Sequence, residues 1–354
     1  MTERHILAIG DPSKDESYRK RLIRHSEYLS KNGVKLSKLN YKDIEKNNLP
    51  DLQEKQILSI LFFPKRFRDQ NIQGWIQKDG IFGGNTHLSE IDKYNQEIEK
   101  KLSKKYDKRL KFLNSPKSIE ITRDKRKIKK ALIENDISTP PLVELNDPSE
   151  LIDYSNKKGI YIKLPGWGYG QGITYLKEGK CFTNFVWDGS KINSKLEMVL
   201  TLPTEISRPT HFLEELMKIE PIIEEEVNFR LIEGEKFDIR MFVIGNPFSK
   251  EKVTTPFWFP RINSPEKLVT NYCRGGKIKY DKKFREKIDK KSLKQTSENI
   301  IKLSEKIGLN YAGMDIMYEK NWNPTILEAQ TDCGLPNPSQ FDVILYLAQK
   351  LIEN

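Results

Sequence analysis

Two acidic residues near the end of the chain, Asp315 and Glu328, stand thirteen residues apart on either side of a short polar turn. Residues 313–319 and 324–330 have the composition of strands, and residues 320–323 are rich in turn formers. A hairpin folded about this turn brings Asp315 directly opposite Glu328. Because like charges that face each other in a ladder are destabilising, the pair calls for a cation between the two carboxylates.

Gln330 follows two residues later, so its amide points to the same face of the hairpin as Glu328. Two carboxylates and an amide oxygen suit a hard cation such as Mg²⁺, which leaves its other positions to water and substrate phosphates. The opposite face is apolar and is expected to pack on a core; it consists of Met314, Ile316, Leu327 and Ala329. A surface hairpin with two solvated acids has the same pattern, so the hairpin alone leaves both interpretations open.

A glycine-rich loop lies in the middle of the chain, between expected strands at 160–163 and 173–176. Glycines let a backbone approach a ligand closely and expose N–H groups, as the binding of phosphates requires. The loop lacks the Gly-Lys-Ser/Thr ending of a Walker A motif and does not lead into a helix. Lys163 directly before it is typical of a flexible lid over ATP phosphates, although an ordinary hairpin with an exposed lysine also fits. The loop residues of interest are Gly168, Gly170, Gln171 and Gly172.

A clean strand is expected at 237–245, where Asp238 and Arg240 alternate with the apolar residues Phe237, Ile239 and Met241. Arginines suit multidentate contacts with phosphate. Two further arginines follow later in the chain, Arg261 and, in the segment 270–276, Arg274. Taken alone, each of these arginines is also compatible with an ordinary surface position.

The remaining sequence predicts an α/β protein in which an N-terminal strand–helix–strand unit precedes the chemistry-bearing segments. Thr122 is the expected N-cap of a helix that ends at Asn135. The other expected elements are strands at 5–11 and 56–63 and helices at 18–31, 88–113, 293–307 and 341–352. With 354 residues, the chain is long enough for two or three domains.

Composition excludes several classes of protein. No apolar run is long enough to span a membrane, and the N-terminus lacks a secretory signal. Three scattered cysteines and four scattered histidines argue against zinc and for a reducing cytosol, so a cytoplasmic location is expected. The net charge of +11 is concentrated in residues 99–130, which suits an acidic carrier or peptide partner as well as a merely solvated helix face. No aromatic motif accompanies it, so nucleic-acid binding is not inferred.

Together these motifs, which occur in one order, resemble the ATP-grasp superfamily, especially its glutathione-synthetase-like branch with the ribosomal-protein glutamate ligases. The resemblance covers residues 114–354. Its motifs are the Asp124-Lys125 helix start with Lys129, Lys163 and its loop, the Glu224–Val227 hinge, Arg240 with Arg261, Asn271 with Arg274, and the Asp315 and Glu328–Gln330 strands.

The resemblance implies an ATP-grasp fold behind a Rossmann-like N-terminal domain, with parts at residues 1–115, 116–222 and 223–354. It implies that ATP binds with one or two Mg²⁺ ions, for which Mn²⁺ can substitute, and that the enzyme is an ATP-dependent carboxylate–amine ligase working through an acylphosphate. The implied nucleotide-binding residues are Lys129, Lys163, Gly168, Gly170, Gln171, Gly172, Glu224, Glu225, Val227 and Asn271. Arg240, Arg261 and Arg274 are the implied catalytic residues, and Asp315, Glu328 and Gln330 the implied metal ligands.

Two departures from the family pattern matter, the first for the metal site and the second for the substrate. Gln330 stands where the family has asparagine, and the turn 331–338 differs from the family, which indicates an unfamiliar acceptor. The substrates are expected to be small-molecule or peptide carboxylates and amines, and a dimer is compatible with the sequence. A kinase with the same ATP site, or a non-catalytic ATP-binding module, are the alternatives: a kinase releases ADP without free phosphate, whereas a binding module turns nothing over.

Overall fold

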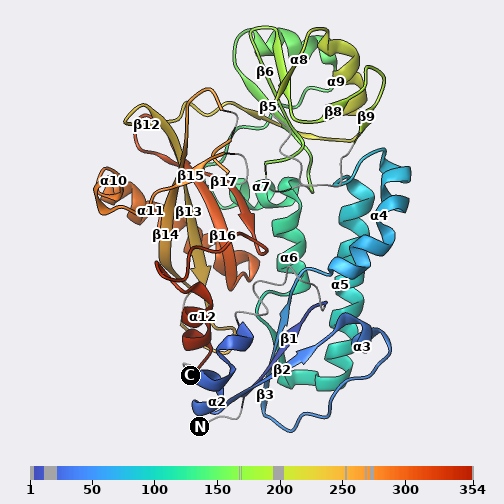
Figure 1. The fold of residues 1–354 in the computed structure, drawn as a ribbon, viewed down its shortest axis with the longest axis vertical. Helices are drawn as coiled ribbons and strands as arrows, with labels where there is room; N and C mark the ends of the chain where they lie inside the picture. Colours follow the sequence, from blue (N-terminus) through green and yellow to red (C-terminus); the bar gives the residue numbers. More distant parts are fainter. Residues whose placement is uncertain are drawn as a thin grey trace.

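The computed structural model describes residues 4–11, 22–166, 168, 170–193, 203–251, 253–267, 269–271 and 275–352. Three sheets of four to six strands lie along the long axis of the molecule, each accompanied by helices (Figure 1). The N-terminal sheet lies at one end, with the two chain ends nearby, and the middle of the chain forms the opposite end. This mixed architecture confirms the expected α/β class.

The N-terminal unit is an all-parallel sheet with the strand order β2-β1-β3-β4. Its elements are β1 (Arg4–Ile9), α2 (Ser26–Lys31), β2 (Val34–Leu39), α3 (Tyr41–Glu45), β3 (Gln56–Leu61), α4 (Lys65–Asp79), α5 (Asn85–Tyr106), η1 (Asp107–Arg109) and β4 (Leu110–Phe112). The centre of β1 is fully buried, as the continuous apolar run of a parallel strand requires. This is the expected Rossmann-like unit, but the helix expected at 88–113 ends at Tyr106, because residues 110–112 pair with β3.

The helix expected at 122–135 is in fact two helices, α6 (Pro116–Arg123) and α7 (Lys125–Glu134). Ser115 caps α6, with its side chain accepting a hydrogen bond of 3.1 Å from the Ser118 N–H and proline at the first helical position. Asp124 has extended backbone and caps α7. Thr122, the expected N-cap, instead donates its hydroxyl to the carbonyl of Ser118 within α6, so that prediction was wrong.

The central unit is an antiparallel sheet with the order β10-β7-β6-β5-β11. Its strands are β5 (Ile160–Lys163), β6 (Ile173–Lys177), β7 (Lys180–Thr183), β10 (Thr204–Ile206) and β11 (Ile222–Glu225), with a small hairpin of β8 (Val186–Trp187) and β9 (Ile192–Asn193). Helices α8 (Pro148–Ser155) and α9 (Pro209–Met217) pack on one face through a core that includes Leu151, Phe212 and Leu216. The expected strand–glycine loop–strand hairpin is therefore β5 and β6.

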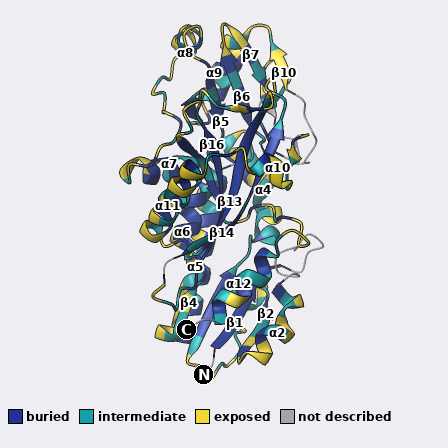
Figure 2. Ribbon diagram, turned by 90° about the vertical axis from the view of Figure 1, so that its left-hand side faces the viewer, coloured by how far each residue is buried: buried dark blue, intermediate teal, exposed yellow. Residues whose placement is uncertain are grey.

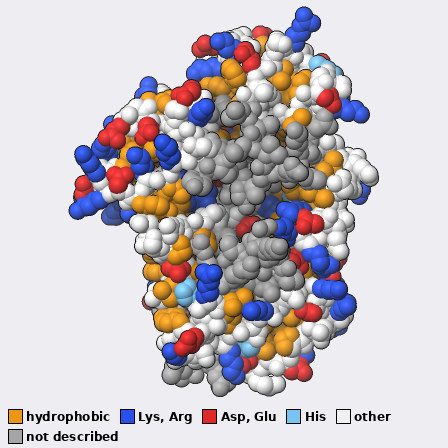
Figure 3. Space-filling model, viewed as in Figure 1, with side chains coloured by type: hydrophobic (Ala, Val, Ile, Leu, Met, Phe, Trp, Pro, Cys, Tyr) orange, Lys and Arg blue, Asp and Glu red, His pale blue; other side chains and the backbone are white. Residues whose placement is uncertain are grey.

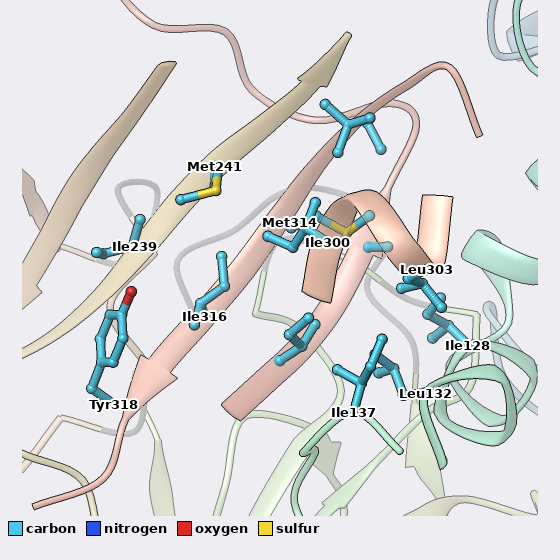
Figure 4. Close-up of a cluster of buried hydrophobic side chains, with 14 of the residues drawn as sticks. Ile128, Leu132, Ile137, Ile239, Met241, Ile300, Leu303, Met314, Ile316 and Tyr318 are labelled. Carbon is cyan, nitrogen blue, oxygen red and sulfur yellow. The ribbon is translucent and has the colours of Figure 1, made fainter. Parts of the chain in front are cut away.

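The C-terminal unit is a sheet with the order β15-β14-β13-β16-β17, and β12 pairs with the first two residues of β13. Its elements are β12 (Leu231–Ile232), β13 (Glu235–Ile244), β14 (Thr254–Asn263), β15 (Lys277–Ile278), α10 (Lys282–Arg285), α11 (Lys290–Ile307), β16 (Tyr311–Tyr318), β17 (Pro324–Gln330) and α12 (Val343–Ile352). The expected alternation in β13 is confirmed: Ile239 and Met241 lie in the core that α7 and α11 cover (Figure 4).

The same sheet joins the N-terminal unit through a second core. Phe242 and Ile244 of β13 pack with Ile6 of β1 and with Leu347 of α12, all of which are nearly inaccessible to solvent. In Figure 2 the buried strands β13 and β16 run through the middle of the molecule, and β1 lies near the end where the two termini are marked. The C-terminal helix α12 therefore packs against both the N-terminal strand β1 and the C-terminal sheet.

The hairpin of β16 and β17 has an irregular register. Asp315 faces Glu328 as expected, but Ile316 pairs with Ile326, because a bulge at Leu327 adds one residue to β17. The bulge turns Leu327 away from the core and into the pocket described below, so its expected core position was wrong. Ile326, fully buried, takes the place in the core.

The basic segment 99–130 does not act as one surface. Lys105 and Lys117 form ion pairs with nearby acids, whereas Lys125 and Lys129 reach carboxylates in the pocket between the sheets. On the face shown in Figure 3, Lys and Arg side chains are interspersed with Asp and Glu. Within the described ranges, no helix combines the length and apolarity of a membrane span.

Candidate active site

A pocket with a cavity of about 110 Å³ lies between the central sheet and the C-terminal sheet. Its walls come from β5, β11, β13, β14, β16 and β17 and from the glycine loop. It brings together eleven of the residues expected from the sequence: Lys163, Gly168, Gly170, Gln171, Glu224, Glu225, Val227, Arg261, Asn271, Asp315 and Glu328.

Three further expected residues do not line the pocket themselves but contact residues that do. Arg240 contacts Asp315, Lys129 contacts Glu224, and Gln330 donates to Glu328. Gly172 is outside the lining and closes the base of the loop, where its carbonyl accepts from the Leu164 N–H at 3.2 Å. Arg274 lies outside the described residues.

One side of the pocket, here called the arginine wall, consists of Asp238, Arg240, Arg261 and Asp315. Arg240 donates through Nε and Nη2 to the two carboxylate oxygens of Asp315, the second at 3.0 Å. Arg261 lies between the two acids, with Nε 2.8 Å from Asp238 Oδ1 and Nη2 2.9 Å from Asp315 Oδ2. Burial alone would raise the pKa of Asp315, but the two guanidinium groups hold it well below its usual value. Asp315 is therefore a carboxylate at neutral pH.

Glu328 completes the acidic pair from the neighbouring strand. Its carboxylate lies 3.7 Å from Lys125 Nζ, and it accepts a hydrogen bond from the amide of Gln330. Burial raises the pKa of Glu328, and the adjacent Asp315 adds to this, while Lys125 opposes it. A divalent cation held by Asp315 and Glu328 would offset both the burial of Glu328 and its repulsion by Asp315.

The other side, here called the lysine wall, consists of Lys129, Lys163 and Glu224. Glu224 is almost completely buried and accepts from both lysines, with Lys129 Nζ 2.9 Å from Oε1 and Lys163 Nζ 2.5 Å from Oε2. Burial would raise the pKa of Glu224, but the two ammonium groups lower it to about 2. Burial also lowers the pKa of Lys129 to about 8, against the attraction of Glu224. Two cations and one anion leave this wall with an excess positive charge.

The hinge after β11 presents backbone groups to the pocket. The N–H groups of Glu225 and Glu226 donate to the carbonyls of Pro141 and Gly159. The carboxylate of Glu225 is held by Tyr154 and Lys158, so neither it nor the Glu225 N–H is available to a ligand. The Val227 N–H has no acceptor among the described residues.

The glycine loop reaches across from β5 to the C-terminal sheet. Gly170 has φ +65°, and a Cβ there would be 3.1 Å from Asn271 Oδ1. Gly168 lies near the amide of Gln330, where a Cβ on the glycine would be 3.9 Å from Nε2. A glycine is thus required at 170 both for its backbone conformation and for the close approach to Asn271.

Sequence reasoning missed several residues that line the pocket: Lys125, Tyr161, Lys236, Thr270, Met317 and Leu327. Lys125 belongs to the Asp124-Lys125 motif identified in the sequence, but its contact with Glu328 was not expected. The break between α6 and α7 places Lys125 at the start of α7, with its Nζ near Glu328. Thr270 donates to Asp238 at 2.7 Å. Burial lowers the pKa of Lys236 to about 8, and its Nζ lies 4.7 Å from the centre of the Phe229 ring.

The donor set at the hairpin fits Mg²⁺ and not a soft metal. In the described part of the chain, no three His, Cys, Asp or Glu residues gather into a metal cluster. The available ligands are the two carboxylates of Asp315 and Glu328 and the amide oxygen of Gln330. Mg²⁺ is typically bound by a few protein oxygens, and substrate phosphates and water complete its coordination shell.

Comparison with known proteins agrees with this arrangement. The sequence profile of the YheC/D-like ATP-grasp family matches residues 93–340, more than two thirds of the chain. The chain belongs to this family. The ATP-grasp membership and fold expected from the sequence are thereby confirmed. No protein of curated function matches the sequence significantly.

Solved structures with the same fold cover nearly the whole chain. The ATP-grasp ligase PsnB, in complex with a minimal precursor, Mg and ADP, has a TM-score of 0.55 and 13% identity over 98% of this chain and 96% of its own. The macrocyclase MdnC from Microcystis aeruginosa MRC, bound to its precursor peptide MdnA, gives 0.52 and 11% over 98% of each chain. The D-cycloserine synthetase DcsG gives 0.56 and 10%, also over 98% of each. At these identities the likeness concerns the fold.

Proposed function

We propose that this protein is an ATP-dependent carboxylate–amine ligase that activates a small-molecule or peptide carboxylate and joins it to an amine. The observation that carries the proposal is that one pocket holds both the lysine wall and the acidic pair Asp315 and Glu328. Structural neighbours that are ATP-grasp ligases with ADP, Mg and precursor peptides support the same reaction class.

ATP binds between the two sheets in this proposal. The purine lies against the hinge, where the Val227 N–H has no acceptor among the described residues. The triphosphate lies along the lysine wall, because Lys129 and Lys163 carry one more charge than Glu224 neutralises. The glycine loop closes over the phosphates and excludes water from them.

Asp315 and Glu328 would hold Mg²⁺, which would neutralise and align the phosphate oxygens. A carboxylate oxygen of the acid attacks the γ-phosphorus, the bond from that phosphorus to the bridging oxygen breaks, and ADP leaves. The amine nitrogen then attacks the acyl carbon, phosphate departs with the electron pair of the C–O bond, and the nitrogen loses a proton to give the amide. Arg240, Arg261 and Lys163 stabilise the charge that develops in the first step.

The decisive experiment is a pairwise screen of acids, amino acids and amines with ATP and Mg²⁺. We expect ADP and phosphate in equal amounts, together with a product whose mass is that of acid plus amine minus water. Release depends on both an acid and an amine. ADP without free phosphate contradicts the ligase and favours a kinase, and no turnover with any pair removes the proposal.

A further inference from the structure

A second cavity, of about 50 Å³, lies beyond the metal end of the nucleotide pocket. It is enclosed by the end of β3, by α5 and α6, by α12 and by the turn that follows β17. Apolar side chains such as Ile60, Leu113 and Leu347 form most of its wall. At roughly 10–15 Å³ for each water-sized probe, the space is enough for a carboxyl group with one or two methylenes.

Arg123 supplies the charge in this wall. Its Nη1 is inaccessible to solvent and has no hydrogen-bond partner, and no carboxylate among the described residues lies within ion-pair distance of it. The guanidinium stacks on Phe63, with Cζ 5.1 Å from the ring centre. Burial lowers the pKa of Arg123, yet a guanidinium keeps its proton at any ordinary pH. Asp92 and Asp332 are near enough to attract the guanidinium, but among the described residues neither forms an ion pair with it. A buried guanidinium N–H that bonds nothing is costly, so it requires an explanation.

The other polar groups of the cavity favour a bound anion at Arg123. Asn95 also lines the cavity, and its Oδ1 is buried without a partner. Because the amide of asparagine can be turned, it can present its NH₂ group to the same ligand. Arg68 stacks on Phe63 from 5.6 Å and adds a second guanidinium to this region. Asp332 also lies in the wall; burial raises the pKa of its carboxyl, while Arg123 and Arg68 attract the carboxylate form. A bound carboxylate therefore shares the guanidinium of Arg123 with Asp332.

Two elements connect this cavity to the nucleotide pocket. At the junction of α6 and α7, Arg123 lines the cavity while Lys125, two residues later, reaches Glu328. At the end of β17, Glu328 belongs to the nucleotide pocket while Thr331 and Asp332 line the cavity. Successive residues on one face of a strand are roughly 7 Å apart. Arg123 and Lys125 are one such step apart, and Glu328 and Asp332 are two, so the cavity begins roughly 7 to 13 Å from the metal end of the pocket, where the γ-phosphate is expected.

We propose that this cavity is the subsite for the acid substrate and that Arg123 selects a carboxylate there. The proposal rests on the proposed ligase function, because it places the acid next to the phosphate that it attacks. The guanidinium offsets the repulsion between the acid and the triphosphate, and it disfavours a protonated amine at the same place. Arg123 is thus a specificity-determining residue for the first half-reaction.

A binding experiment tests the subsite without any turnover. Thermal unfolding is followed in sodium acetate, succinate, L-aspartate or L-glutamate and in sodium chloride of equal ionic strength. In the wild type we expect at least one carboxylate to raise the melting temperature by about 2 °C or more over chloride. Arg123→Met should lose this rise. Equal melting temperatures in all salts mean that the cavity holds only water, and they overturn the proposal.

Arg109→Met is a matched control. Arg109 and Arg123 are both of intermediate exposure as whole residues, but the Arg109 guanidinium donates to the carbonyls of Leu52 and Glu54, at 2.8 and 3.1 Å. We expect Arg109→Met to lower the melting temperature in chloride while keeping the carboxylate-dependent rise. Arg123→Met should not lower it in chloride, because its Nη1 bonds nothing. A large loss of stability in Arg123→Met, with the carboxylate effect intact, identifies a structural arginine.

A kinetic experiment then separates this subsite from the ligase activity. Hydroxylamine intercepts an acylphosphate as a hydroxamate, so turnover of an acid is measured without its natural amine. We expect Arg123→Gln to raise the KM for the acid roughly 10- to 100-fold and to leave the KM for ATP unchanged. An unchanged KM for the acid overturns the subsite while the ligase stands. No hydroxamate from the wild type, together with carboxylate-dependent stabilisation, removes the ligase and retains a carboxylate site.

Discussion

The arginine wall and the lysine wall face each other across one pocket, but their charges are balanced differently. Two arginines and two aspartates make the arginine wall neutral and rigid, with three direct contacts at 2.8 to 3.0 Å. In the lysine wall, Lys129 and Lys163 share the single carboxylate of Glu224. The lysine wall therefore has a net positive charge that can bind a triphosphate. The arginine wall would become positive only if a metal ion bound Asp315 and so weakened its ion pairs with the two arginines.

The strongest test of this difference is Glu328→Ala, which removes one of the two carboxylates that a cation needs. We expect Mg²⁺-dependent turnover to fall about 1,000-fold, because charge stabilisation at the phosphates is lost. ATP binding without metal should persist, since the lysine wall is intact. Steady-state rates and nucleotide titration measure the two effects. Glu298→Ala, on the exposed side of α11, is the control, and normal turnover in Glu328→Ala contradicts the metal assignment.

Glu224→Gln tests whether the lysine wall depends on its single anion. Its pKa of about 2 lies below the value of about 4.3 in an unfolded chain, so Glu224 stabilises the fold above pH 5 and loses this effect as the pH falls toward 2. The contribution corresponds to about 3 kcal/mol. Denaturant unfolding between pH 2.5 and 7 should show a smaller acid-side loss of stability in Glu224→Gln than in wild type. Identical pH profiles refute the buried ion pairs.

Lys163→Met removes positive charge from the lysine wall while Lys129 still pairs with Glu224. We expect ATP to bind roughly 10- to 100-fold more weakly, as for the loss of a charge-assisted contact. The matched control is Lys177→Met, on the next strand, because Lys177 does not line the pocket although its partner Glu226 does. Calorimetric titration with ATP distinguishes them. Equal affinities in the two variants place the triphosphate elsewhere.

Gly170→Ala tests the loop that connects the two walls. Alanine must adopt φ +65° there and approach Asn271 Oδ1 to 3.1 Å, so we expect a few-fold rise in the KM for ATP and about 1 kcal/mol less stability. Gly179→Ala places the same strain, at φ +73°, in the hairpin between β6 and β7. It should lose stability with unchanged kinetics. Similar kinetics in both variants argue against a closing loop.

Local patterns predicted much of this site. The alternation in β13, the glycine loop between β5 and β6 and the pairing of Asp315 with Glu328 all follow from short-range rules and are observed. The bulge at Leu327 was not predictable, because the register of a hairpin depends on packing as well as on its turn. The start of α7 was misplaced because Thr122 and Asp124 are both good N-caps, and only tertiary structure selects between them.

Contacts between residues far apart in the sequence could not be predicted from local sequence patterns. Glu224 was identified as part of the nucleotide hinge, but its carboxylate pairs with two lysines that lie 95 and 61 positions earlier in the chain. The turn after Gln330 was expected to mark the substrate. Thr331 and Asp332 do line a cavity, but its charged residue, Arg123, was not singled out from the sequence. An unpartnered guanidinium has no sequence signature, because only the folded chain determines which cations lack a counter-ion.

In the proposed mechanism, a carboxylate in this pocket attacks the γ-phosphate of ATP. The most direct test of this step uses an acid that the substrate screen identifies, labelled with ¹⁸O in its carboxylate and supplied with ATP, Mg²⁺ and the amine or hydroxylamine. The released phosphate is analysed by mass spectrometry. The proposed reaction transfers one ¹⁸O from the acid to each phosphate, because the C–O bond breaks when the amine attacks. Phosphate without ¹⁸O, while ATP is consumed, contradicts this mechanism.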